Sequence, residues 1–128
     1  MFKQYIFFRH KGALKKLDID EIVVMEANDN YIKIIGLENF FTVRISLETA
    51  LKRLPSKKFI RIHRSYVVSL DYIESIDKES VLLGDKETML PVSRMYYQKL
   101  SRQLVILDAD ISVRKKRNSA VKSLLHQS

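Results

Sequence analysis

The sequence predicts a single, mostly β domain. Short segments rich in Val, Ile, Phe and Tyr recur along the chain, and clusters of Asn, Asp, Gly or charged residues separate them, as in proteins built from short strands and turns. Only Ser46–Leu54 has the spacing of a clear helix. The length of 128 residues suits one domain with its own hydrophobic core and is too short for two of ordinary size.

The first half of the chain predicts five strands before the helix. The predicted strands are Gln4–Arg9, Ala13–Leu17, Ile22–Ala27, Tyr31–Ile35 and Phe40–Ile45. Asp18 can cap one helical turn after the second strand, and Asn28–Asn30 is a turn by composition. The helix has Ser46 as a suitable N-cap and Pro55 as its stop. The apolar character of Ile22–Ala27 predicts a central strand of a sheet.

The second half is organised around a polar triplet, His63–Ser65, between two apolar runs. Phe59–Ile62 and Tyr66–Leu70 are predicted strands, so the triplet must reach the surface between two anchored ends; an ordinary solvated turn is the alternative. Three further strands and a second helix follow, at Tyr72–Ile76, Ser80–Leu83, Thr88–Pro91 and from Ser93 or Arg94 onward. We expect the aromatic residues to lie mainly in the core, with only Tyr31 and Tyr96 beside polar loops.

Composition excludes several classes of protein. The chain has no cysteine, which rules out a disulfide framework and a thiolate metal site. Its apolar runs are far shorter than a membrane span, and its first residues lack the apolar core and cleavage site of a signal peptide. We therefore expect a cytoplasmic protein without membrane contact.

Charge is distributed unevenly, with a formal net charge of +8. Lys52–Arg64 holds six basic residues and no acidic one, whereas Asp71–Glu87 holds six acidic residues against two lysines. The sequence thus predicts a basic face and an acidic face, and the basic face favours a polyanionic partner. A basic protein without such a partner is the plainer alternative.

No constellation of catalytic residues is present, so we expect neither enzymatic activity nor a cofactor. The three His are far apart, and three Gly are too few for a phosphate-binding loop. His63 beside Ser65 is better explained by a local hydrogen bond that fixes the loop than by a hydrolase site. The neighbouring Asp18, Asp20 and Glu21 are better explained by a capped helical turn than by a metal site, so we expect no metal.

Three polar loops each interrupt or follow an apolar strand, at Asn28–Asn30, His63–Arg64 and Ser93–Arg94. Asn side chains can recognise adenine and Arg side chains guanine. Three such loops on a small basic domain favour DNA as the polyanion.

At these residues the sequence resembles the LytTR family of bacterial DNA-binding domains. The resemblance covers about residues 3–105 and is carried by five segments in matching order. These segments are Asp20–Ala27, Asn30-Tyr31, Phe59–Leu70 (FIRIHRSYVVSL), Tyr72–Ile76 and Pro91–Arg94 (PVSR). We expect three departures from the common family pattern: no receiver domain before the DNA-binding domain, a basic C-terminal extension that the resemblance does not cover, and Ser69 where the family often has Asn.

The resemblance implies about ten short strands in stacked antiparallel β-sheets, with one or two short helices. It also implies that loops, and not a recognition helix, enter successive major grooves of DNA. The positions that match the family's base-reading loops are Asn30, Arg64 and Arg94. Contacts with the DNA backbone are expected at Lys57, Lys58, Arg61, His63 and Ser93.

We therefore expect residues 1–107 to form a LytTR-like DNA-binding domain and residues 108–128 a basic C-terminal extension, with a short helix over Ser112–Leu125 if that segment packs. The expected function is a sequence-specific regulator of transcription that binds double-stranded DNA, with two copies forming a homodimer on two repeat half-sites. The alternative is a protein-interaction module of a signalling pathway, whose loops bind a signalling partner and whose association is insensitive to salt.

Overall fold

Residues 4–108, which the computed structural model describes, form ten short strands, two α-helices and three 3₁₀ turns. The strands are β1 Tyr5–His10, β2 Ala13–Asp18, β3 Val24–Asn28, β4 Tyr31–Ile35, β5 Phe40–Val43, β6 Phe59–His63, β7 Tyr66–Ser69, β8 Ile73–Ile76, β9 Ser80–Leu83 and β10 Met89–Pro91. The helices are α1 Leu47–Arg53 and α2 Arg94–Lys99, and the 3₁₀ turns are η1 Ile19–Glu21, η2 Leu70–Tyr72 and η3 Leu100–Arg102. The expected helix over Ser112–Leu125 lies outside the described residues.

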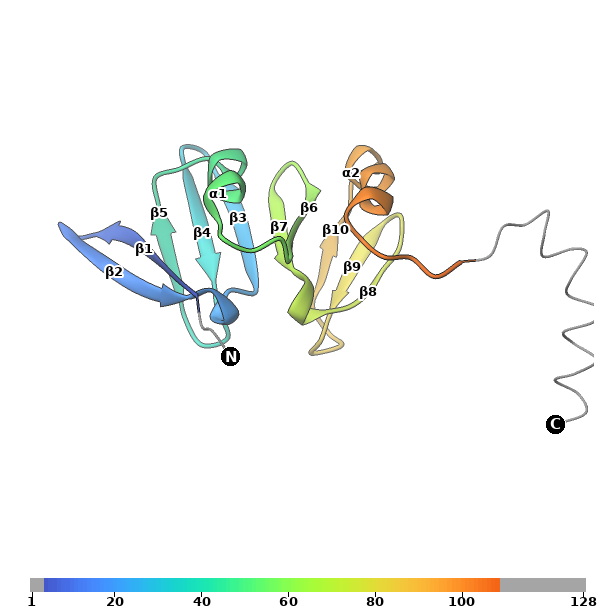
Figure 1. Cartoon of the computed structure of the whole chain (residues 1–128), viewed down its shortest axis with the longest axis horizontal. Coiled ribbons are helices and arrows are strands. Elements are labelled where there is room, and N and C mark those ends of the chain that lie inside the picture. Colours follow the sequence, from blue (N-terminus) through green and yellow to red (C-terminus); the bar gives the residue numbers. More distant parts are fainter. Residues whose placement is uncertain (1–3, 109–128) are drawn as a thin grey trace, which may run out of the picture.

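The strands form three antiparallel sheets that follow one another along the molecule (Figure 1). The hairpin β1–β2 is at one end, and the three-stranded sheet β10-β9-β8 is at the other. Between them lies a five-stranded sheet in the order β5-β4-β3-β7-β6. The mostly β fold expected from the sequence, with about ten strands in antiparallel sheets, is confirmed.

The five-stranded sheet is covered on both faces, which explains why its central strands are continuously apolar. Val67 and Val68 are adjacent in β7, point to opposite faces and are both fully buried. Val67 belongs to a core cluster shared with Leu47 and Ala50 of α1, whereas Val68 belongs to a second cluster shared with Val81 of β9. A one-residue slip of β7 would exchange the two clusters, so burial fixes its register.

Local signals set the ends of most elements as the sequence predicts. The Ser46 hydroxyl caps α1 by accepting a hydrogen bond from the N–H of Thr49 at 3.1 Å, and the Ser93 hydroxyl caps α2 in the same way. Lys11 and Gly12, with φ of 51° and 80°, form the turn between β1 and β2. Two consecutive positive φ values suit a two-residue hairpin whose twist matches its strands.

Two expectations about local structure are wrong. The segment Leu70–Tyr72, expected to end one strand and begin the next, is the 3₁₀ turn η2, with the Ser69 hydroxyl accepting a hydrogen bond from the N–H of Asp71. Four aromatic residues expected in the core are exposed: Tyr5, Phe7, Phe40 and Tyr97. Alternation along β1 explains the first two, because inward-facing Phe8 is buried while its neighbours on the outer face have no cover.

Lys58, immediately before β6, joins this strand to two 3₁₀ turns at one edge of the molecule. Its side chain is only 17% exposed, and its ammonium group forms salt bridges with Asp20 of η1 and, at 2.8 Å, with Asp71 of η2. The Tyr72 hydroxyl also donates to the carbonyl oxygen of Asp20 at 2.6 Å. Burial lowers the pKa of Lys58, but the hydrogen bonds and charges of Asp20 and Asp71 outweigh it and raise that pKa above the usual 10.5.

Replacing Lys58 with Ala should lower the free energy of unfolding by about 1–3 kcal/mol, because two carboxylates and a partly buried junction lose their shared cation. The pKa is raised in the folded state, so this contribution should be full at neutral pH and disappear only as pH rises past about 10.5. Urea denaturation at pH 7 measures it. The matched control is Lys57→Ala, which removes the adjacent exposed lysine and should change the free energy by less than about 0.5 kcal/mol. Equal effects of both changes would contradict this role of Lys58.

Candidate nucleic-acid interface

Three loops far apart in the sequence meet at one edge of the molecule. The turn between β3 and β4, the turn between β6 and β7 and the start of α2 all lie at the upper edge in Figure 1. We call this the loop edge. It carries Asn30, Arg64 and Arg94, and all three side chains are exposed. The structure therefore brings together the three residues that were expected to contact bases.

The turn between β6 and β7 consists of only Arg64 and Ser65, because His63 pairs with Tyr66 across the hairpin. Neither turn residue has a positive φ, unlike the usual two-residue hairpin. The register shifts between Arg61 and His63 instead, so a β-bulge provides the bend that glycine would otherwise allow.

The backbone of this turn is held by hydrogen bonds from three directions. The carbonyl oxygen of Ile62 accepts from the N–H of Ser93 at 2.9 Å, which attaches the turn to the start of α2. The carbonyl oxygen of Ser65 accepts from the N–H of Ala27 at 2.9 Å, which attaches it to β3. Arg64 is therefore displayed from a backbone that is fixed on both sides.

Arg61, within the hairpin itself, donates the third set of hydrogen bonds to the turn. Its Nε donates to the carbonyl oxygen of His63 at 3.3 Å, and its guanidinium Nη2 donates to the carbonyl oxygen of Arg64 at 2.6 Å. The guanidinium carbon also lies 5.2 Å from the centre of the Tyr96 ring, a cation–π contact with α2. The guanidinium group expected to contact phosphate is thus engaged with the turn.

His63 adds a further local restraint. Its Nδ1 accepts a hydrogen bond from the N–H of Ser65 at 3.0 Å, which confirms the local bond expected from the sequence. Its ring centre lies 5.7 Å from that of Tyr66. The pKa of Tyr66 is raised, first by burial and then by the hydrogen bond to the Glu26 carboxylate. This hydrogen bond connects the ring pair of His63 and Tyr66 to β3.

The predicted phosphate-contacting residues do not all lie at the loop edge. Lys57 and Lys58 precede β6, whereas the Arg64 turn follows it, and a six-residue extended path from Lys58 to Arg64 spans roughly 20 Å. Lys58 is also paired with Asp20 and Asp71. Ser93 is at the loop edge, where its N–H and hydroxyl are both used in structural hydrogen bonds.

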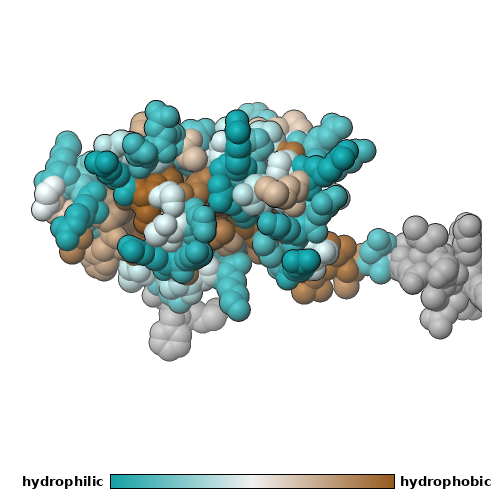
Figure 2. All heavy atoms as spheres, turned by 90° about the horizontal axis from the view of Figure 1, so that it is seen from above, coloured by the Kyte–Doolittle hydropathy of each residue, from teal (hydrophilic) through white to brown (hydrophobic). Residues whose placement is uncertain are grey.

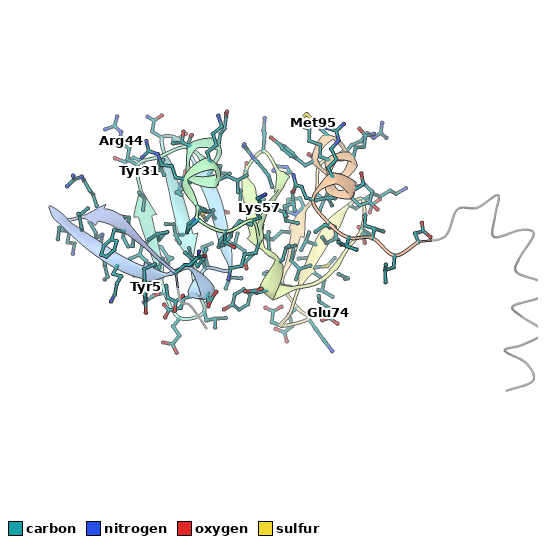
Figure 3. The ribbon with its side chains drawn as sticks, viewed as in Figure 1. Tyr5, Tyr31, Arg44, Lys57, Glu74 and Met95 are labelled. Carbon is teal, nitrogen blue, oxygen red and sulfur yellow. The ribbon has the colours of Figure 1, made fainter. Side chains whose placement is uncertain are left out.

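Arg44 is a residue that sequence reasoning missed. It is exposed in the segment between β5 and α1, and Figure 3 shows it on the same edge as Tyr31 and Met95. The available signal was strand direction: β5 is antiparallel to β4, so it must end at the edge where β4 begins. Arg44 adds a cation beside the turn that carries Asn30.

The chemistry of the loop edge is that of hydrogen-bond donors and positive charge. Arg44, Arg64 and Arg94 can donate to phosphate oxygens or to base acceptors, and Asn30 can both donate and accept. Residues 4–108 contain no group of three acidic or His ligands that could hold a metal ion. That part of the chain also has no helix long and apolar enough to cross a membrane.

Removing the guanidinium of Arg61 should loosen the turn in the free protein. Arg61→Ala leaves the carbonyl groups of His63 and Arg64 without their donor, so amide hydrogen exchange across residues 62–66 should accelerate by about tenfold, equivalent to about 1.4 kcal/mol. Hydrogen–deuterium exchange measured by mass spectrometry tests this. Arg53→Ala, at the exposed end of α1, is the control and should leave that segment unchanged. Unaltered exchange in Arg61→Ala would show that the turn does not depend on Arg61.

Comparisons with known proteins show the family of this chain. The family described as LytTr DNA-binding domain matches residues 12–105. The chain is 31% identical over 108 residues to the sensory transduction protein LytT of Bacillus subtilis, covering 77% of this chain and 45% of that protein. It is 31% identical over 112 residues to the heme-containing CO-sensing transcriptional regulator RcoM 1 of Paraburkholderia xenovorans, covering 84% and 41%. The chain thus spans less than half the length of these relatives.

A solved structure supports the fold. The LytTr DNA-binding domain of a putative methyl-accepting/DNA response regulator from Bacillus cereus superposes with a TM-score of 0.68 at 23% identity. The match covers 82% of this chain and all of that one. The arrangement of ten short strands and two helices is therefore shared with a domain of that description.

Proposed function

Because the chain belongs to the family of LytTr DNA-binding domains, we propose that it is a sequence-specific regulator of transcription that binds double-stranded DNA and has no enzymatic activity. The observation that carries the proposal is the loop edge, where separate loops present three exposed side chains and backbone hydrogen bonds attach the Arg64 turn to β3 and to the start of α2. We propose a cytoplasmic location, where the DNA lies. Residues 1–107 are assigned to DNA binding and residues 108–128 to a basic extension.

Base recognition is assigned to Asn30, Arg64 and Arg94. An Arg side chain can donate two hydrogen bonds to O6 and N7 of guanine, and an Asn side chain can pair with N6 and N7 of adenine. The loops are spread along one edge of the molecule (Figure 1), which suits insertion into successive major grooves. A fixed backbone behind Arg64 lowers the entropy cost of forming such contacts.

Phosphate contacts are assigned by position and by what each side chain already does. Arg44 lies at the loop edge and His63 and Ser93 adjoin the base-reading residues, so these three border the DNA backbone. Lys57 is exposed and can reach a more distant phosphate. Lys58 and Arg61 act on DNA through the fold, since their cationic groups hold Asp20 and Asp71 in one case and the Arg64 turn in the other.

Two copies are proposed to bind two repeat half-sites as a homodimer on DNA. The competing proposal is a protein-interaction module of a signalling pathway, in which the same loops bind a protein. Salt separates them, because neutralising DNA phosphates releases counterions and makes affinity fall steeply as salt rises.

Arg64→Ala and Arg94→Ala should each relax preference at one base position while leaving the fold intact. Each lost bidentate contact should reduce discrimination at that position by about 1–3 kcal/mol, and Asn30→Ala should do the same more weakly. The measurement is competition between the site selected from a random DNA pool and its single-base variants, at one salt concentration.

The matched control is Arg53→Ala, which removes an exposed arginine at the end of α1. It should lower affinity slightly for all sequences and keep the full ratio between preferred and variant sites. If Arg64→Ala and Arg94→Ala also keep that ratio, these residues contact only the backbone and the assignment of base recognition is wrong.

Salt should weaken binding in proportion to the number of phosphates contacted. With about five phosphates neutralised, the slope of log affinity against log salt should be roughly −4 to −5. Arg44→Ala should flatten that slope by about 1 and weaken all sequences equally. Fluorescence anisotropy at four salt concentrations gives the slopes. An affinity that does not change with salt would favour the protein-interaction module.

A further inference from the structure

The two ends of the molecule carry opposite charge. The hairpin β1–β2 and its turn hold the basic residues Arg9, Lys11, Lys15 and Lys16. The sheet β8–β10 and its turns hold the exposed acidic residues Glu74, Asp77, Glu79, Asp85 and Glu87, against Lys78 and Lys86. Figure 1 places this hairpin and this sheet at opposite ends, with the loop edge between them.

The outer face of the hairpin combines apolar and basic side chains. Phe7 is paired with Lys16 across the hairpin and Arg9 with Leu14, so these four side chains share one face. Phe7 is 60% exposed and Leu14 61%, although both are large and apolar. The Lys16 ammonium lies 4.7 Å from the centre of the Tyr5 ring on the same face. We call these five residues the hairpin face.

The opposite end combines apolar and acidic side chains, and we call it the acidic end. Its turns carry acidic residues, Asp77 and Glu79 between β8 and β9 and Asp85 and Glu87 between β9 and β10, and Met89 beside the second turn is exposed. Hydrogen bonds from the N–H groups of Glu79 and Ser80 lower the pKa of Asp77, and bonds from Thr88 and from the N–H of Glu87 do the same for Asp85. Both carboxylates are therefore ionised at neutral pH.

The carboxylates beside these turns have no cation assigned to them within the part of the chain that the structure describes. The salt bridges of that part join Lys52 with Glu48 and Lys58 with Asp20 and Asp71, and none involves Glu74, Glu79 or Glu87. The hairpin face has the complementary composition: exposed apolar groups bordered by Arg9 and Lys16.

We infer that copies of this chain associate head to tail on DNA, with the hairpin face of one copy against the acidic end of the next. The inference rests on the proposed function, because tandem half-sites are what align the copies. Copies that present the loop edge to one DNA duplex in the same orientation bring opposite ends of neighbouring molecules together. Such a contact joins two different surfaces, so it can repeat along DNA.

The contact should be weak in solution and effective on DNA. Exposed ion pairs contribute little individually, and the apolar area offered by Phe7, Leu14 and Met89 is small. On adjacent half-sites, however, the second copy is held near the first, and a high effective concentration allows a weak contact to act. The consequence is cooperative binding without a stable dimer in free solution.

Charge exchange between the two surfaces tests the inference. One variant, Arg9→Glu with Lys16→Glu, makes the hairpin face acidic, and the other, Glu74→Lys with Glu87→Lys, makes the acidic end basic. None of these residues is at the loop edge. The probes are DNA fragments with one selected half-site or with two in the same orientation, at a series of spacings, bound by the full chain.

The wild-type protein should fill the second half-site about tenfold more readily than a single one at the best spacing. Each variant alone should lose this advantage, because like charges then meet at the contact. An equal mixture of the two variants should restore it, since the acidic hairpin face of one meets the basic end of the other. Lys52→Glu with Arg53→Glu, on α1, carries the same change in charge as the hairpin variant and should keep the advantage.

Independent filling of two half-sites at every spacing, together with selective binding of one half-site, would overturn this inference and leave the proposed function standing. Failure of the mixture to restore cooperativity would also overturn it. If the wild-type protein does not select any half-site, the proposed function itself fails, and the head-to-tail contact fails with it.

Discussion

The structure depends on the hydrogen bonds that converge on the carbonyl groups of residues 62–65. A two-residue hairpin without glycine or proline has no intrinsic preference for its bend, so its backbone needs partners. Ser93 supplies one from the start of α2, Ala27 one from β3, and Arg61 two from within the hairpin. The same bonds that satisfy the turn therefore connect it to β3, the strand before the Asn30 turn, and to the start of α2. The hydrogen bonds that satisfy the backbone of the turn are thus the same ones that fix the position from which Arg64 extends.

The basic residues between Lys52 and Arg64 look alike in sequence but have different surroundings in the structure. Between Lys52 and Arg64 there are six cations, and composition alone gives them one interpretation, attraction to a polyanion. Lys58 is instead largely buried between Asp20 and Asp71, and Arg61 is bound to backbone carbonyls. Arg64 alone lies in the displayed turn. A cation can serve as a structural donor or as a ligand contact, and only its neighbours in space decide which.

The fold was largely predictable because its signals are local. Strand periodicity, the caps at Ser46 and Ser93 and the turn at Asn28–Asn30 lie within a few residues of the elements they define. The exposure of Asn30, Arg64 and Arg94 was also predictable, since polar residues between buried strands must reach the surface. The partners of Lys58 were not, because Asp20 is 38 residues away along the chain and comes near only through packing. Exposure of Phe7 was missed for a similar reason, since alternation shows which residues share a face but not whether that face is covered.

The small number of side chains that we propose to read bases has an energetic consequence. Three contacts worth about 1–3 kcal/mol each provide roughly 3–9 kcal/mol of discrimination per copy. Specific binding usually exceeds non-specific binding by about 4–10 kcal/mol, so one copy with weak contacts falls below this range and one with strong contacts lies within it. Strengthening the loop edge with more positive charge would not help, because phosphate contacts raise the affinity for all sequences alike. In the proposed arrangement a second copy adds discrimination, because the oppositely charged ends would let two copies combine their contacts without altering the loop edge.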